Sequence, residues 1–136
     1  MISSIIYATG IILAGFPGSA FLIALIAGAI YMFQSILGIL ALIAFILRGV
    51  FTEIFFILLG IYHGNLTIAR VSIAMMIASF LTGISFYLLF VHVLRVLPDW
   101  GLMPFIIITS TAVISNGVGG FLTVKYIIPL IKRIVP

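Results

Sequence analysis

Charged side chains are scarce in this sequence, and their scarcity excludes most water-soluble folds. Only 6% of the 136 residues are charged, whereas 65% are hydrophobic. A soluble domain carries about a quarter charged residues, and a chain this apolar has too little polar surface to face water. We therefore predict an integral membrane protein whose main partner is the lipid bilayer.

Cysteine is absent and acidic residues number only two, which limits the available chemistry. Without cysteine there are no disulfides and no thiol chemistry. The sequence contains no carboxylate pair, metal-ligand spacing, nucleophile elbow or phosphate-binding loop. His63 and His92 are expected near opposite membrane faces, which disfavours a haem with two histidine ligands. We therefore expect no enzyme activity, no metal and no cofactor.

The six basic residues give a net charge of +4. They lie at the ends of apolar segments and do not cluster with aromatic residues, so they are typical of membrane orientation and not of nucleic-acid binding. None of them precedes the first apolar run, at residues 5–14, followed by small residues at 18–20. We therefore expect this run to be retained and not cleaved as a secretory signal.

Long, continuous apolar runs fill the sequence instead. Within a bilayer only helices and closed barrels satisfy the backbone, and barrel strands alternate in hydrophobicity over about ten residues. The runs here are longer and do not alternate. We predict an all-α, polytopic integral membrane protein with about four transmembrane helices, plus a short re-entrant or interfacial hydrophobic segment, in a single transmembrane domain over 1–136.

The first 47 residues form one apolar region that must bend or fold back. A helix of this length would extend about 70 Å, more than twice the roughly 30 Å of the hydrocarbon layer. The division that we favour places spans at 2–23, kinked at Pro17, and at 26–47. The alternative is a short helix to Gly15, a turn, and one long tilted span over 19–47.

A shorter apolar segment separates this region from two further spans. Residues 49–62 are fewer than the 17–25 of a usual crossing, so we predict a re-entrant or interfacial segment; a full crossing is the alternative. Asn65 or Thr67 is expected to cap the next helix. Spans are then predicted at 71–94 and 102–124.

Basic residues predict the orientation of these spans. If the segment 49–62 does not cross, Arg95 stands alone on one side and five basic residues share the other, which gives the sharper bias. These five are Arg48, Arg70, Lys125, Lys132 and Arg133. The C-terminus is then predicted to be cytoplasmic.

Small residues recur at every fourth position in three of the spans. On a helix this spacing builds a flat stripe that allows a second helix to approach closely. We predict that the stripes are helix-packing interfaces, either between subunits or within the chain. Their members are Ala20, Ala24 and Gly28; Ala74, Ala78 and Thr82; and Thr111, Ser115, Gly119 and Thr123.

The last span also has a polar centre, where Asn116 stands among three glycines. Asparagine has several donors and acceptors to satisfy, and glycine eases local unwinding. Broken helices at the membrane midplane line ion and substrate sites in transporters. Asn116 and Gly117 are therefore a candidate pore or polar site. The competing hypothesis is that Asn116 forms a hydrogen bond across a helix interface.

Glu53 is the one carboxylate within an apolar stretch. Intramembrane acids often mark proton or cation pathways, so Glu53 joins the candidate polar site. The competing hypothesis places it at the membrane interface, hydrated or paired with Arg48 or Arg70.

Three functional hypotheses follow. The leading one is a small structural or accessory membrane subunit that associates through small-residue helix faces, with copies of itself or within a larger membrane complex. The second is a small channel or transporter that uses Asn116, Gly117 and Glu53. The third is a holin-like, virion or pilus membrane component that assembles laterally.

Overall fold

The structure is a computed structural model that describes residues 2–34, 38–64, 66–95, 97–99 and 101–134. Every regular element in these residues is a helix, so the prediction of an all-α fold is confirmed. Three helical stretches are long and apolar enough to cross a membrane, as expected of a multi-pass membrane protein.

The first two helices are short. Helix α1 (Ile2–Ala14) ends at Gly15, which has a positive φ of 67° that glycine adopts at little steric cost. Pro17 follows and cannot donate a helical hydrogen bond. Helix α2 (Ser19–Gln34) then begins. With 13 and 16 residues, α1 and α2 are about 20 and 24 Å long, less than the roughly 30 Å hydrocarbon layer.

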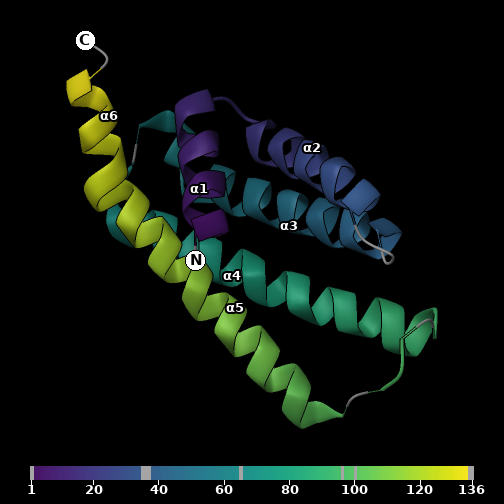
Figure 1. The fold of residues 1–136 in the computed structure, drawn as a ribbon. Helices are drawn as coiled ribbons and strands as arrows, with labels where there is room; N and C mark the ends of the chain where they lie inside the picture. The colour runs from purple at the N-terminus through teal and green to yellow at the C-terminus, as the bar shows by residue number, and fades with distance from the viewer. Residues whose placement is uncertain (1, 35–37, 65, 96, 100, 135–136) are drawn as a thin grey trace.

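Helix α3 (Gly38–Leu58) folds back along α2 as an antiparallel hairpin (Figure 1). A Cβ atom added at Gly38 would lie 2.7 Å from the carbonyl carbon of Met32, so a glycine is needed at this close approach. A short 3₁₀ helix, η1 (Ile61–His63), follows α3.

Helix α4 (Ile68–Tyr87) begins after Thr67, whose side chain accepts a hydrogen bond from the Arg70 N–H at 3.4 Å. It continues through a π-helical turn, η2 (Leu88–Val93). The prediction of Thr67 as a helix cap is confirmed, whereas the alternative cap, Asn65, lies outside the described residues.

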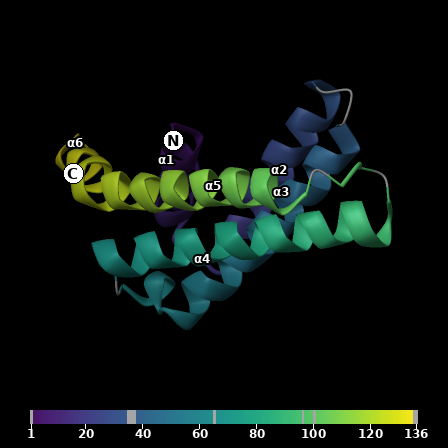
Figure 2. The ribbon, with the colours of Figure 1, turned by 90° about the horizontal axis from the view of Figure 1, so that it is seen from below.

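Helix α5 (Leu102–Leu122) runs back beside α4 and continues through the π-helical turn η3 (Thr123–Ile127) into α6 (Ile128–Ile134). Figure 2 shows α4 and α5 side by side, and Figure 1 shows α1 lying across α5. The buried apolar core lies where α1 meets α2, α3 and α4, around Ile11 and Phe56.

The helix boundaries in the first half of the chain differ from the predicted spans. The predicted span 2–23 is divided between α1 and α2, and 26–47 is divided between α2 and α3. The alternative correctly predicted a short first helix and a turn, but its long span 19–47 is also two helices. The polar signal for the fold-back is short: Gln34 and Ser35 interrupt the two apolar runs where α2 ends.

The predicted segment 49–62 is not a separate element. Its first ten residues complete α3, and its last two are the first two residues of η1. Arg48 therefore lies inside a helix and not between two elements, and it has a polar partner within the chain, Asn116. The predicted number of four crossings is not tested by these boundaries.

Candidate functional site

Arg48 lies at the middle of α3, ten residues after Gly38 and ten before Leu58. One guanidinium nitrogen, Nη2, donates to Asn116 Oδ1 at 2.5 Å, and the guanidinium carbon lies 4.6 Å from the centroid of the Tyr7 ring. The side chain is partly buried. A cation that faces an aromatic ring is attracted by the ring's negative face, so Asn116 and Tyr7 together compensate part of the cost of removing Arg48 from water.

Asn116 joins three helices at this point and is 5% exposed. Its oxygen accepts from Arg48 on α3, and its Nδ2 donates to Ser79 Oγ on α4 at 2.9 Å and to the Ala112 carbonyl on α5 at 2.8 Å. Both ends of the amide are therefore used. The geometry matches the competing hypothesis of an interhelical hydrogen bond, and it adds an arginine that the sequence did not associate with this site.

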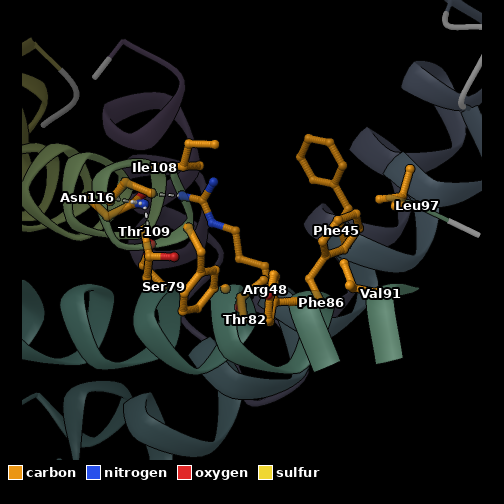
Figure 3. A pocket seen from close by; sticks show the side chains of 15 residues that line it. Phe45, Arg48, Ser79, Thr82, Phe86, Val91, Leu97, Ile108, Thr109 and Asn116 are labelled. Carbon is orange, nitrogen blue, oxygen red and sulfur yellow. Dashed lines mark hydrogen bonds between the residues drawn. The ribbon is translucent and has the colours of Figure 1, made fainter. Parts of the chain in front are cut away.

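A cavity of about 440 Å³ opens beside Arg48, between α3, α4 and α5 (Figure 3). At one end lie Arg48, Asn116 and Ser79, with the hydroxyls of two threonines near them. At the other end the walls are apolar and aromatic. The apolar residues of the wall are Ala44, Phe45, Gly83, Phe86, Val91, Leu97, Phe105, Ile108 and Ala112. The remaining lining residue is Tyr87, so a single positive charge stands at one end of a largely apolar space.

The chain's two carboxylates bond elsewhere, so neither neutralises Arg48. Asp99 accepts from the Tyr87 hydroxyl at 2.6 Å and from the Gly101 N–H at 2.9 Å, in the loop between α4 and α5. These bonds, the tyrosine's first, lower the pKa of Asp99 below its ordinary value.

Glu53 lies on α3, outside the cavity, and its carboxylate bonds to N–H groups at the start of α2. Its Oε1 accepts from the Gly18 N–H at 2.5 Å, and its Oε2 accepts from the Ala20 N–H at 3.1 Å and the Tyr62 hydroxyl at 3.0 Å. The start of a helix has unpaired N–H groups and a partial positive charge, which a carboxylate satisfies. Burial is the main cause that raises the pKa of Tyr62 above its ordinary value.

The glycines of α5 provide close contacts with other helices. An added Cβ would lie 2.6 Å from Met76 Cγ at Gly117, 2.6 Å from Ser4 Cβ at Gly119, and 3.2 Å from Ser72 Cα at Gly120. Helix α5 remains α-helical throughout this stretch. The proposed unwinding is therefore wrong, because helix packing already accounts for the small residues.

The stripes on α2 and α4 lie in contacts within the chain. Ala20, Ala24 and Gly28 are buried, and an added Cβ at Gly49 of α3 would lie 2.7 Å from Ala24 Cβ. Ala74 and Ala78 are buried as well. The Thr82 hydroxyl donates to the Ala78 carbonyl at 2.7 Å, beside the cavity.

The stripe on α5 is divided between two environments. Thr123 is fully buried and donates to the carbonyls of Gly119 at 2.8 Å and Ile5 at 3.4 Å, which joins α5 to α1. Thr111 is exposed and donates to the Ile107 carbonyl at 2.8 Å, and Ser115 is half-buried. Only the first part of this stripe therefore faces away from the chain's own helices.

The structure brings Arg48, Ser79 and Asn116 together and leaves Glu53 apart, so only one of the predicted polar residues lies at the cavity. Arg48 is absent from the predicted site because the sequence places it at the end of a span. One signal was available: an apolar stretch of ordinary crossing length extends to both sides of Arg48, which places the charge at its centre. Intramembrane ionisable residues are functional candidates by default.

Comparison with other proteins assigns no family to this arrangement. No protein-family model, no curated protein and no solved structure matches the chain. The function must therefore be inferred from the cavity and the residues that surround it.

Proposed function

We propose that this protein is a multi-pass membrane protein that binds an anionic molecule inside the membrane, at Arg48. One observation supports the proposal above the others. The guanidinium lies at the middle of a helix long enough to cross the bilayer, beside a cavity, while both carboxylates bond elsewhere.

The energetics favour a negative ligand. An arginine at the centre of a transmembrane helix costs about 2.5–3.5 kcal/mol on insertion scales, and a cation–π contact returns about 0.5–2 kcal/mol. A guanidinium has five N–H donors. Among the described residues, Asn116 is the one hydrogen-bond acceptor that Arg48 reaches. An anion in the cavity would use the remaining donors and neutralise the charge.

The proposal includes four crossings, formed by α2, α3, α4 and the continuous α5–α6 helix, with α1 packed across them. Arg70, Lys132 and Arg133 then lie on one face and Arg95 on the other. Such a bias favours a cytoplasmic C-terminus.

The absence of cysteine makes this topology easy to test, because each introduced cysteine is the chain's only thiol. Arg95→Cys and Lys132→Cys should react with a membrane-impermeant maleimide from opposite sides of oriented vesicles. Labelling of both from the same side would contradict the topology.

Anion binding itself is tested with purified protein in mild detergent. We expect benzoate, benzenesulfonate or octanoate to raise the melting temperature of the wild type, because a ligand that binds only the folded state stabilises it. Arg48→Gln should lose this shift. Arg70→Gln is the matched control, because Arg70 is exposed and does not line the cavity. The proposal is wrong if none of the anions shifts the wild type, or if Arg48→Gln keeps the shift.

An accessory membrane subunit is the second candidate function. The observation that favours it is the start of the α5 stripe, where Thr111 is exposed and Ser115 is half-buried, so the chain's own helices cover it only in part. Small and hydroxyl residues on an open face suit contact with a second transmembrane helix. Native mass spectrometry from mild detergent should then detect a dimer or a bound partner, and Thr111→Leu with Ser115→Leu should disrupt it. A monomer in both proteins would contradict this candidate.

A further inference from the structure

We infer that the ligand is a single-chain amphipathic acid, with one carboxylate bound at Arg48 and one hydrocarbon chain along the apolar part of the cavity. This inference rests on the anion site proposed above and names the class of molecule that the site accepts. The proposed anion site depends on the charge of Arg48 alone, whereas the class of ligand depends on the shape and the lining of the whole cavity.

The cavity is largely apolar, and its charged and amide side chains, Arg48 and Asn116, lie at one end. Tyr87 also lines it, and its hydroxyl donates to Asp99. Figure 3 shows the Arg48 guanidinium directed toward Asn116 and Ser79, with Leu97 and Val91 at the opposite end. A ligand that fills this space needs a polar group at one end and an apolar body. Small hydrophilic anions would leave the apolar part empty, and neutral hydrocarbons would leave the guanidinium without a partner.

The polar end suits a carboxylate. A guanidinium presents its N–H donors in a planar fork that matches the two oxygens of a carboxylate. Asn116 accepts the hydrogen bond from Nη2 and fixes the orientation of the fork. The Thr82 hydroxyl, which also lines the cavity, is neutral and donates its proton to the Ala78 carbonyl. Arg48 is therefore the group that selects for charge.

The apolar end suits one chain. The whole cavity extends along α5 from Asn116 at its polar end to Phe105. These residues are eleven positions apart, or about 16 Å at 1.5 Å per residue. A volume of about 440 Å³ is near the lower end of the 300–1,000 Å³ of small-molecule pockets. This volume accommodates a single medium-length chain and is too small to hold two long chains together.

The depth of the charge gives the direction of binding. Arg48 lies at the middle of α3, and the apolar walls continue from it toward the loop between η2 and α5. The carboxylate would therefore lie near the membrane midplane, with the chain directed to the face that carries this loop. An acid dissolved in the bilayer has the opposite orientation, with its carboxylate at the water interface. Only a protein site that supplies a buried cation would reverse it.

The test compares ligands that differ in one feature, with the protein in nanodiscs of zwitterionic lipid. Binding of dodecanoate, dodecanol, acetate and a two-chain phosphatidate is measured by native mass spectrometry and by competition. We expect dodecanoate to bind at least about tenfold more tightly than dodecanol, because a hydrogen bond to a charged group contributes about 1.5–3 kcal/mol and 1.4 kcal/mol corresponds to tenfold. Phosphatidate should bind at least about tenfold more weakly than dodecanoate.

Two variants test separately the binding of the ligand's carboxylate and the binding of its hydrocarbon chain. Arg48→Gln should reduce dodecanoate binding to the level of dodecanol. Ala44→Phe fills the cavity from α3, one helical turn before Arg48. It should reduce dodecanoate binding at least about tenfold while acetate, which needs only the head site, binds as before. Arg70→Gln should leave all four ligands unchanged.

The outcomes distinguish this inference from the anion site on which it rests. If acetate binds as well as dodecanoate and Arg48→Gln weakens both, the anion site stands and the single-chain ligand is wrong. If dodecanol or phosphatidate binds the wild type as tightly as dodecanoate, the inference is also overturned. If no carboxylate binds, both proposals fail. The acid–alcohol comparison uses wild-type protein, so it remains decisive even if a variant does not fold.

Discussion

Arg48 and Glu53 lie five residues apart on α3, yet the protein satisfies them in different ways. Glu53 accepts three hydrogen bonds, two from the first turn of α2 and one from Tyr62. Arg48 donates to one side-chain oxygen, that of Asn116, and faces a cavity. Both carboxylate oxygens of Glu53 are thus hydrogen-bonded, whereas the Arg48 guanidinium retains N–H donors for the proposed ligand.

This difference shows why position within an apolar stretch is a weak guide to function. Glu53 had the sequence features of a transport residue, but its bonds explain it as a cap for a neighbouring helix. Arg48 had the features of a topological marker, but it lines a cavity, where we propose that an anion binds. The partners of a charged group, more than its depth, indicate its role.

The largest effect is expected for Glu53→Leu. Two N–H groups at the start of α2 would lose their acceptor, and hydrogen bonds to a charged group contribute about 1.5–3 kcal/mol each. We expect a loss of about 3 kcal/mol in the free energy of unfolding, measured by denaturant titration in mild detergent. Glu53→Gln, which keeps one acceptor oxygen, should lose less. A change below about 1 kcal/mol would show that Glu53 is not structural.

Tyr62→Phe tests one bond of the same cluster. It removes the hydroxyl that donates to Glu53 at 3.0 Å, and we expect a loss of about 1 kcal/mol at neutral pH. Because burial raises the pKa of Tyr62, its contribution is present below pH 10.0 and is lost as the pH rises through the folded-state value. The variant should therefore lose less stability than the wild type in alkaline solution. An identical alkaline slope for the two proteins would contradict this account.

A smaller effect on stability is expected for Arg48→Leu. Asn116 Oδ1 loses its donor, which costs about 1–3 kcal/mol for a buried acceptor. The replacement also removes a charge that costs about 2.5–3.5 kcal/mol within a membrane, so the two effects largely offset each other. We expect the free energy of unfolding without ligand to change by less than about 1 kcal/mol in either direction, in the same titration. A loss as large as that of Glu53→Leu would mean that Arg48 holds the fold together, and the contrast between the two residues would disappear.

The smallest effect is expected for Asp99→Asn. Asp99 accepts from a tyrosine hydroxyl and a backbone N–H, donors of the same kind as those of Glu53, but it is exposed to solvent. Its lowered pKa means that its contribution is present above its ordinary value of 3.8 and is lost as the pH falls through the folded-state value. Melting curves at pH 7 and pH 3 should show a small difference between wild type and variant at pH 7 only. A large effect at pH 7 would indicate that donor type, not burial, decides the strength of such a cluster.

The first half of the chain was the harder part to predict. Residues 71–94 and 102–124 were expected as helices, and α4 and α5 occupy these ranges closely because Arg70, Arg95 and Pro98 interrupt the apolar pattern beside them. The fold-back between α2 and α3 is marked by two neutral polar residues, Gln34 and Ser35, and by no charge or proline. Helices in lipid are distinguished from their connections by polar residues, and this signal is weaker than an arginine or a proline.

The candidate site was predicted in part. Asn116 was identified because a buried amide must find partners, and the prediction that it bonds across helices describes its contact with Ser79. The role of Arg48 was not predicted, because its assignment to a span end placed it in water. A span centred on the arginine would have placed it in the membrane beside Asn116.

Composition alone determined the solvent and the type of backbone structure. With so few charges and such long apolar runs, the chain needs a bilayer and, within it, helices. The tertiary structure decided which polar residues became caps, which became helix contacts and which were left beside a cavity. The role of each polar residue depends on the helix that it faces: on α3, Glu53 faces α2 and Arg48 faces α5. The hydrophobicity of a single helix does not specify which neighbouring helix each of its residues will face.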